Sequence, residues 1–262
     1  MCRLFGLYAN KPVDVYFSFF ESPRSSLAEL SRENYSGWGV AWYDNDWHIY
    51  KEPLPLHSPA INREAIRRGA RGRIVVSHVR HASIGGGSPE NTHPWLYHGW
   101  VFAHNGTIDR EVLLELLHEE HLDLEGDTDS EAFFHLIVQE TEDLGDPIEG
   151  IVSAVGKVVG KGINSSTSLN FIASNGEKLY ALRYAITGLD HYTLYYLERP
   201  GEVELRKLSE ETHQLILTKL AQGEKAVVIA SEPMSDEPNW KPIPNKNLAI
   251  IDPNLDVELI PL

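Results

Sequence analysis

The chain has 262 residues, of which 42% are hydrophobic and 23% are charged, an ordinary balance for a globular protein that buries its own core. Its formal net charge of −15 argues against general binding to a nucleic-acid backbone, which requires clustered lysine and arginine. One cysteine excludes an internal disulfide, and with neither a signal peptide nor a run of ~20 apolar residues we expect a cytoplasmic protein that contacts no membrane.

The first hundred residues are predicted to form short strands separated by turns. The basic stretch 67–73 is interpreted as a solvated helix end that leads into a strand, with its cations at the helix C-terminus. A hairpin is predicted around Asp44-Asn45-Asp46, and a last strand is predicted to end at His104-Asn105-Gly106. The predicted strands are 3–9, 37–43, 47–50, 73–80 and 100–103, and the predicted helix is 61–68.

Three helices are predicted next, over 109–120, 128–142 and 148–159. The second opens with Thr128-Asp129-Ser130-Glu131, which matches the capping box. The third opens with Asp146-Pro147, a favourable cap and first-turn pair.

The second half is predicted to be mainly strands. Asn175-Gly176 is a strong hairpin signal between two of them. This order of elements predicts an α+β domain of two sheets with helices packed outside, rather than a βαβ winding. The predicted strands are 167–173, 178–184, 192–197, 226–230 and 248–251, and one more helix is predicted over 210–221.

Cys2 occupies a chemically special position. A lone cysteine is usually an inert small hydrophobe. Removal of Met1, however, would leave a free α-amino group on Cys2, with a reference pKa of about 7.7 to 8.0. Such an amine can act as the base for its own thiol. We therefore predict that Cys2 is a nucleophile and that the active form is a single domain over 2–262.

Four polar clusters follow Cys2 in the chain. Taken singly, each has an ordinary structural explanation: a surface cation, a plain turn or a helix cap. The clusters are Ser77-His78-Val79-Arg80-His81-Ala82-Ser83, Asn91-Thr92-His93-Pro94, His104-Asn105-Gly106-Thr107 and Gly126-Asp127-Thr128-Asp129-Ser130-Glu131.

In this order the motifs resemble the class II glutamine amidotransferases, whose domain has the N-terminal-nucleophile (Ntn) hydrolase fold. The resemblance extends from Cys2 to about position 135 and continues more weakly to Ser231-Glu232-Pro233. It implies a four-layer αββα sandwich of two mainly antiparallel sheets. It also implies hydrolysis of the side-chain amide of glutamine, or of a γ-glutamyl amide, with no cofactor.

The resemblance implies a role for each matching residue. Arg80 would hold the α-carboxylate of the substrate, and Asp129 its α-ammonium group. Asn105, through its side-chain amide, and Gly106, through its backbone N–H, would form the oxyanion hole. The resemblance also puts His81, Ser83 and His93 in the substrate-binding region. Ser83 and His93 would have only an orienting or hydrogen-bonding role, and His81 would affect access of the substrate.

Two features depart from the large synthases of that family. They carry Trp where this chain has His81, and they carry a second domain that consumes the ammonia, whereas about thirty residues follow Ser231 here. A separate ammonia-accepting synthase subunit is therefore one possible partner. The physiological amide and the oligomeric state are left open by the sequence.

Two other functions are compatible with parts of the sequence. A glutaminase-fold protein that has lost activity could serve as a binding subunit, although no expected catalytic residue is missing. A metallohydrolase could use the histidines clustered within 27 positions, although no HExxH motif is present. We therefore expect no metal. The histidines are His78, His81, His93, His98 and His104.

Overall fold

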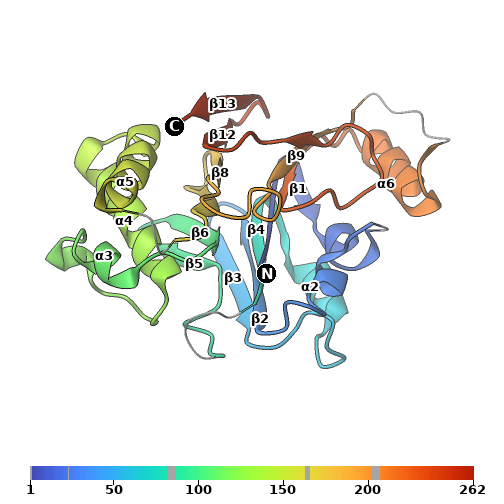
Figure 1. The fold of residues 1–262 in the computed structure, drawn as a ribbon. Helices are drawn as coiled ribbons and strands as arrows, with labels where there is room; N and C mark the ends of the chain where they lie inside the picture. Colours follow the sequence, from blue (N-terminus) through green and yellow to red (C-terminus); the bar gives the residue numbers. More distant parts are fainter. Residues whose placement is uncertain (1, 23, 82–86, 163–165, 202–206) are drawn as a thin grey trace.

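Two antiparallel sheets organise the molecule, which a computed structural model describes over residues 2–22, 24–81, 87–162, 166–201 and 207–262 (Figure 1). The larger sheet has the order β11-β9-β10-β1-β4-β2-β3. Its strands in that order are Lys241–Pro242, Tyr195–Arg199, Ala226–Ala230, Arg3–Asp14, Arg71–Arg80, Gly37–Tyr43 and Trp47–Glu52.

The smaller sheet has the order β13-β12-β8-β7-β6-β5. The predicted hairpin at Asn175-Gly176 joins β7 to β8, and Gly176 adopts the positive φ of 83° that such a turn favours. The strands in sheet order are Val257–Pro261, Asn247–Ile251, Leu179–Arg183, Asn170–Ser174, Trp100–Asn105 and Trp95–Tyr97.

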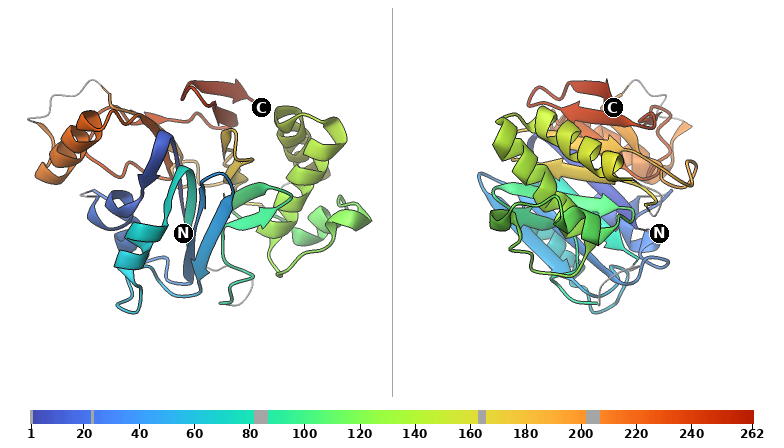
Figure 2. Two further views of the ribbon diagram at one scale, coloured as in Figure 1. Left: turned by 180° about the vertical axis from the view of Figure 1, so that it is seen from behind. Right: turned by 60° about the vertical axis from the view of Figure 1, so that its left-hand side comes forward.

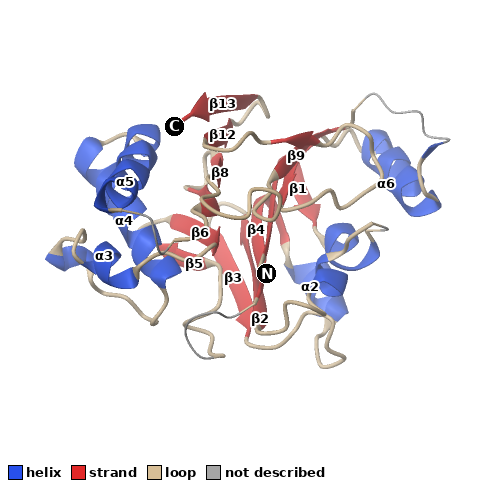
Figure 3. Cartoon of the chain, viewed as in Figure 1, coloured by secondary structure: helices blue, strands red, loops and turns tan. Residues whose placement is uncertain are grey.

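Helices lie outside both sheets (Figure 3). Figure 1 shows α3, α4 and α5 beyond the smaller sheet, and α2 and α6 on the opposite side of the molecule. The α-helices are α1 (Leu27–Leu30), α2 (Arg63–Gly69), α3 (Arg110–Leu114), α4 (Asp129–Leu144), α5 (Pro147–Lys161) and α6 (Glu210–Ala221). A π-helical turn, η1, covers Phe17–Glu21, and a 3₁₀ turn, η2, covers Glu119–His121.

The space between the sheets is filled by alternate strand residues. Leu4 and Ile74 enter it from the larger sheet, and Val101 and Ile172 from the smaller one. Because strand side chains alternate between faces, every second residue of β1, β4 and β6 faces this space. The strand ends therefore decide which polar groups can meet there.

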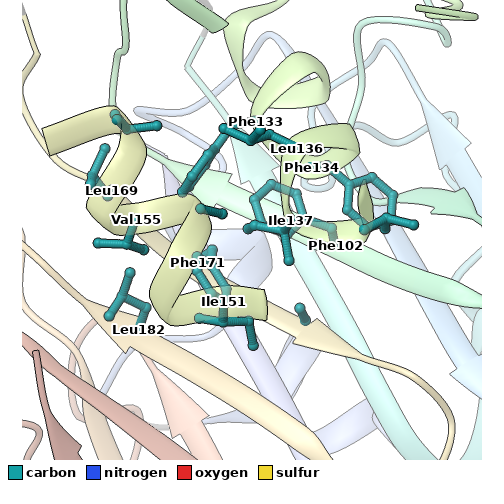
Figure 4. Close-up of a cluster of buried hydrophobic side chains, with 14 of the residues drawn as sticks. Phe102, Phe133, Phe134, Leu136, Ile137, Ile151, Val155, Leu169, Phe171 and Leu182 are labelled. Carbon is teal, nitrogen blue, oxygen red and sulfur yellow. The ribbon is translucent and has the colours of Figure 1, made fainter. Parts of the chain in front are cut away.

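Two further apolar clusters join helices to the outer sheet faces. Figure 4 shows the cluster under α4 and α5, where Phe102 and Phe171 on the smaller sheet pack near Phe133 and Ile151 on the helices. On the other side, η1, α1 and α2 pack on the larger sheet, with Phe19 fully buried. The views from behind and from the side agree on this layering (Figure 2). The predicted four-layer α+β sandwich is confirmed.

Helix α4 is buried along most of its length. The Oγ1 atom of Thr128 accepts a hydrogen bond from the backbone N–H of Glu131, as a helix cap does, and Gly145 ends the helix in the left-handed conformation. The capping box is only half formed. The carboxylate of Glu131 accepts instead from the backbone N–H groups of Glu125 and Gly126, at 2.8 Å each.

Two predicted boundaries are wrong for identifiable reasons. The helix predicted over 109–120 ends at Leu114, because Gln139 on α4 binds the backbone of Leu116 and His118 and so replaces helical hydrogen bonds there. The strand predicted over 100–103 continues through His104 and Asn105, which pair with β7. The other predicted elements are present, with ends that differ by no more than about five residues.

None of the helices that the structure describes is long and apolar enough to cross a membrane.

Candidate active site

Cys2 and Arg80 lie at the same end of the two central strands of the larger sheet. β1 and β4 are antiparallel, with Arg3 opposite Val79 and Leu4 opposite His78, so the next pair outward is Cys2 with Arg80. Leu4 faces the space between the sheets, and Cys2, two residues before it, therefore faces the same way. Arg80 is buried, and its charge acts on the Cys2 thiol, so the guanidinium lies near the sulfur.

The thiol of Cys2 is held by the backbone of His81. Its Sγ accepts a hydrogen bond from the His81 N–H at 3.2 Å. Burial raises the pKa of the Cys2 thiol, while the His81 hydrogen bond and the charge of Arg80 act in the opposite direction. A thiol with a raised pKa is not a standing thiolate at neutral pH, so it requires a base.

The side chain of His81 lies at the rim of this region and is exposed. Its Nδ1 is 3.1 Å from the backbone carbonyl oxygen of Glu33, and its ring meets that of Tyr35 edge-on at 6.0 Å. Its backbone contacts the Cys2 sulfur, and the effect of His81 on substrate access stays a prediction.

Asn105 approaches from the opposite sheet. It ends β6, two residues after Ala103, which faces the larger sheet, so its buried side chain points in the same direction. β6 in turn contacts both β1 and β4 across the space between the sheets. The amide of Asn105 therefore enters the region of Cys2 and Arg80.

Position 106 requires glycine because the backbone of Ser168 approaches it closely. A Cβ atom at this position would lie 1.9 Å from the carbonyl oxygen of Ser168 and 2.9 Å from Nε2 of His104. No side chain fits there without moving the backbone of the neighbouring segment. The turn that follows Asn105 is thus fixed in place.

His104 lies on the other face of β6 and does not enter the inter-sheet space. Its Nε2 is 3.2 Å from the Ser168 carbonyl oxygen and its Nδ1 is 2.8 Å from the Ser130 hydroxyl. The carbonyl can only accept, so Nε2 carries the proton and Nδ1 accepts from Ser130. Burial lowers the pKa of His104, in keeping with a neutral ring. His104 thereby joins β6 to the first turn of α4.

Asp129 occupies that first turn. Its Oδ2 accepts a hydrogen bond from the backbone N–H of Ile108 at 2.6 Å, and its side chain is buried. The N-terminus of a helix favours a negative charge. The carboxylate is therefore held next to the turn that contains Asn105 and Gly106.

His93 stacks on His78, with ring centroids 4.0 Å apart, and also contacts Trp95 at 4.1 Å. Gly39 on β2 permits this approach, because a Cβ there would lie 2.3 Å from the His93 carbonyl oxygen. The peptide between His93 and Pro94 is cis. In the described part of the chain, neither ring of the stacked pair has a hydrogen-bonding partner.

Both stacked rings are buried. Burial, with the Arg80 cation as a lesser cause, lowers the pKa of His78 to about 3, and burial lowers that of His93 well below its ordinary value. The pair is therefore neutral at physiological pH. It forms one wall of the space that Arg80 enters.

The structure thus brings most of the predicted site residues together. Cys2, Arg80, Asn105 and Gly106 lie at one end of the space between the sheets, with Asp129 behind the turn. Ser83 lies outside the described residues. Three contributors were not singled out as site residues from the sequence: the buried His78, Ser168 beneath Gly106, and Ser130, which holds His104.

The histidines do not form a metal site. His78 faces the space between the sheets and stacks on His93, His104 faces the helix layer, and His81 faces the surface. His98 pairs with Glu142 at 2.7 Å. Across the described ranges, no group of three or more His, Cys, Asp or Glu side chains has an arrangement that could hold a metal ion. The metallohydrolase alternative therefore has no support from this geometry.

Comparisons with known proteins identify the family and the fold. Residues 1–253 match the family model described as class II glutamine amidotransferases. A γ-glutamyl-hercynylcysteine sulfoxide hydrolase of Mycolicibacterium smegmatis is 26% identical over 82% of this chain and 77% of its own length. A glutamine aminotransferase class-II domain protein of Silicibacter pomeroyi has the same fold, with a TM-score of 0.67 at 21% identity and 99% of both chains covered.

A larger enzyme shares the fold. The glutamine phosphoribosylpyrophosphate amidotransferase of B. subtilis gives a TM-score of 0.66 at 14% identity, and the match covers 99% of this chain but 49% of that one. The family match spans nearly the whole sequence, and the fold is the one expected of that family. The chain belongs to the class II glutamine amidotransferases.

Proposed function

We propose that this protein hydrolyses the side-chain amide of glutamine, or a γ-glutamyl amide, through a γ-glutamyl thioester on Cys2. The observation that carries the proposal is the register of β1 and β4, which sets Cys2 beside the buried Arg80. A nucleophile next to a fixed guanidinium fits a substrate that has an α-carboxylate a few bonds from its reacting carbonyl.

The chemistry requires that Met1 be removed. The free α-amine of Cys2 takes the thiol proton, and the sulfur attacks the amide carbon. The Asn105 amide and the Gly106 N–H stabilise the oxyanion, and loss of one such donor costs about 10²–10³ in rate. The C–N bond then breaks as the ammonium returns its proton to the leaving ammonia or amine.

Water completes the cycle. The α-amine takes a proton from the water molecule that attacks the thioester, the C–S bond breaks, and the thiolate is protonated again as glutamate leaves. Arg80 and Asp129 act on the substrate's α-carboxylate and α-ammonium groups, which do not change during the reaction. Their binding energy serves to align the reacting carbonyl with Sγ.

The leaving group can be either ammonia or an amine. The similar mycobacterial protein is named for a γ-glutamyl conjugate, and the rim beside Cys2 carries His81 and Tyr35 rather than a tryptophan. A substrate whose amide nitrogen bears a substituent is therefore part of the proposal. An ammonia-accepting partner subunit would apply only if free glutamine is the substrate.

Intact-mass spectrometry tests the proposal. The processed chain is incubated with a diazoketone analogue of glutamine, with Cys2→Ala as the control. We expect a chain that lacks Met1 to gain one adduct and the variant to gain none. Full glutaminase activity in a chain that retains Met1 would contradict the mechanism, because its amine is then tied up in a peptide bond.

A further inference from the structure

Glu232 lies against the beginning of the chain although it is 229 positions away from Arg3 in the sequence. Its Oε2 pairs with Nε of Arg3 at 2.9 Å, and the two side chains are 32% and 18% exposed. Its other oxygen accepts a hydrogen bond from the hydroxyl of Ser25. This acidic residue belongs to the Ser231-Glu232-Pro233 motif, to which the proposed mechanism assigns no role.

The strand register explains the contact. β10 pairs with β1 up to Ala230 opposite Phe5. The pairing extends one residue further, because the Leu4 N–H donates to the Ser231 hydroxyl at 2.9 Å and the Ser231 N–H donates to the Leu4 carbonyl at 3.1 Å. The next residue, Glu232, is thereby carried to Arg3.

Arg3 also holds the nucleophilic residue itself. Its Nη1 donates a hydrogen bond to the backbone carbonyl oxygen of Cys2 at 3.2 Å. Backbone bond lengths then place this guanidinium nitrogen within about 7 Å of the Cys2 backbone nitrogen. Among the described residues, Arg80 on β4 acts by its charge on the Cys2 thiol, Arg3 on β1 contacts the Cys2 backbone, and Glu232 after β10 pairs with Arg3. The backbone N–H of His81 contacts the Cys2 sulfur.

We propose that Arg3 and Glu232 are a positioning pair for the N-terminal nucleophile. Arg3 anchors the backbone of Cys2, and Glu232 both fixes Arg3 and balances its charge beside the α-amino group. The inference rests on the proposed function, because only a processed Cys2 has that amino group. Arg3 and Glu232 touch no substrate and act through Cys2.

The pair has two opposed electrostatic effects. A positive charge favours the deprotonated forms of both the amine and the thiol, and a negative charge disfavours them. Loss of Glu232 leaves Arg3 unbalanced, so the Cys2 groups lose their protons at lower pH. Loss of Arg3 leaves Glu232 unbalanced, so they lose them at higher pH. A purely mechanical role would give both variants the same kind of defect.

The test is the pH dependence of alkylation. The rate at which the diazoketone analogue modifies the processed chain is followed by intact mass between about pH 5 and pH 9, which spans the reference pKa values of the amine and the thiol. The variants are Arg3→Gln, Glu232→Gln and the double variant. Arg68→Gln is the control, since Arg68 is in an exposed ion pair with Glu64 on α2.

We expect the pH midpoint of alkylation to rise by about 0.5–1 pH unit in Arg3→Gln, for charges about 7 Å apart near a protein surface. The midpoint should fall in Glu232→Gln, by a smaller amount because the carboxylate reaches Cys2 through Arg3. The double variant should return toward the wild-type midpoint, and about 1 M salt should reduce both shifts. The control should match the wild type.

If Arg3→Gln does not fold, Glu232→Gln alone tests the positioning role, because glutamine is nearly isosteric with glutamate. A midpoint that stays unchanged or rises in Glu232→Gln overturns the inference while leaving the proposed function intact. A processed wild-type chain that is never alkylated contradicts the proposed function instead.

Discussion

Asn91 accepts a hydrogen bond through its Oδ1 from the backbone N–H of Asp127 at 2.9 Å, and so ties the loop before β5 to the start of α4. Gly126 leaves room for this contact, since a Cβ there would lie 2.5 Å from the same oxygen. Asp129 follows two residues later. This hydrogen bond therefore links the Asn-x-His-Pro loop to the helix that carries the proposed ammonium ligand.

Replacing Asn91 with alanine should weaken substrate binding more than chemistry. The part-buried hydrogen bond from the N–H of Asp127 is lost, which costs about 0.5–1.5 kcal/mol, and the first turn of α4 is free to shift. We expect KM for glutamine or its γ-glutamyl analogue to rise about tenfold with a smaller change in kcat. Steady-state kinetics measure this, and an unchanged KM would show that the tie does not position Asp129.

Gly106→Ala should abolish activity and destabilise the fold. The new methyl group would overlap the Ser168 carbonyl, so the backbone that presents the Gly106 N–H must move. A rate loss of at least about 10² is expected from a displaced oxyanion donor.

The control for this variant is Gly156→Ala on α5, where a Cβ meets nothing within 4 Å. This replacement should stabilise the helix by about 0.5–1 kcal/mol and leave the rate unchanged. Thermal unfolding and initial rates separate the two variants. Equal melting temperatures and equal rates for both would show that the turn after Asn105 is not tightly packed.

Acid should destabilise the protein through its buried histidines. The folded-state pKa values of His78, His93 and His104 are lowered by burial, so the unfolded chain binds protons more readily than the folded one. Stability is therefore fully present above about pH 6.5 and is lost as the pH falls below it toward the folded-state values.

His93→Gln removes one of these groups. The slope of the unfolding free energy against pH should then fall by up to about 1.4 kcal/mol per pH unit between about pH 6 and pH 4. Urea unfolding at a series of pH values measures the slope. A slope equal to that of the wild type would mean that His93 is protonated in the folded chain.

Much of the architecture was predictable from local signals. The helix predicted over 128–142 was recognisable because Thr128 caps it and its apolar residues recur, and the strand over 226–230 because it is a short apolar run. Such signals involve residues close in the sequence. They identify individual helices and strands well, but they say little about which helices and strands pack together.

The errors come from contacts between distant segments. The helix over 109–120 is cut short by Gln139, whose role depends on how α4 packs. The contact of Glu232 with Arg3 depends on a strand register closed across almost the whole chain. The short strands β5, β11 and β13 were also missed, since two to five residues give little periodicity. The motifs named the candidate residues, but only the register showed that Cys2 and Arg80 lie side by side.

That adjacency leads to a sharp prediction for Arg80. A lysine would keep the positive charge but replace the planar, two-pronged donor with a point charge on a flexible stem, so it cannot hold a carboxylate in the same way. We expect Arg80→Lys to lower kcat/KM for a substrate with a free α-carboxylate by about 10- to 100-fold. The same variant should change the rate much less for the α-carboxamide analogue of that substrate, which offers no carboxylate to either side chain. A loss that is equal for the two substrates would mean that Arg80 acts on the Cys2 thiol, whose pKa its charge lowers, rather than on the substrate.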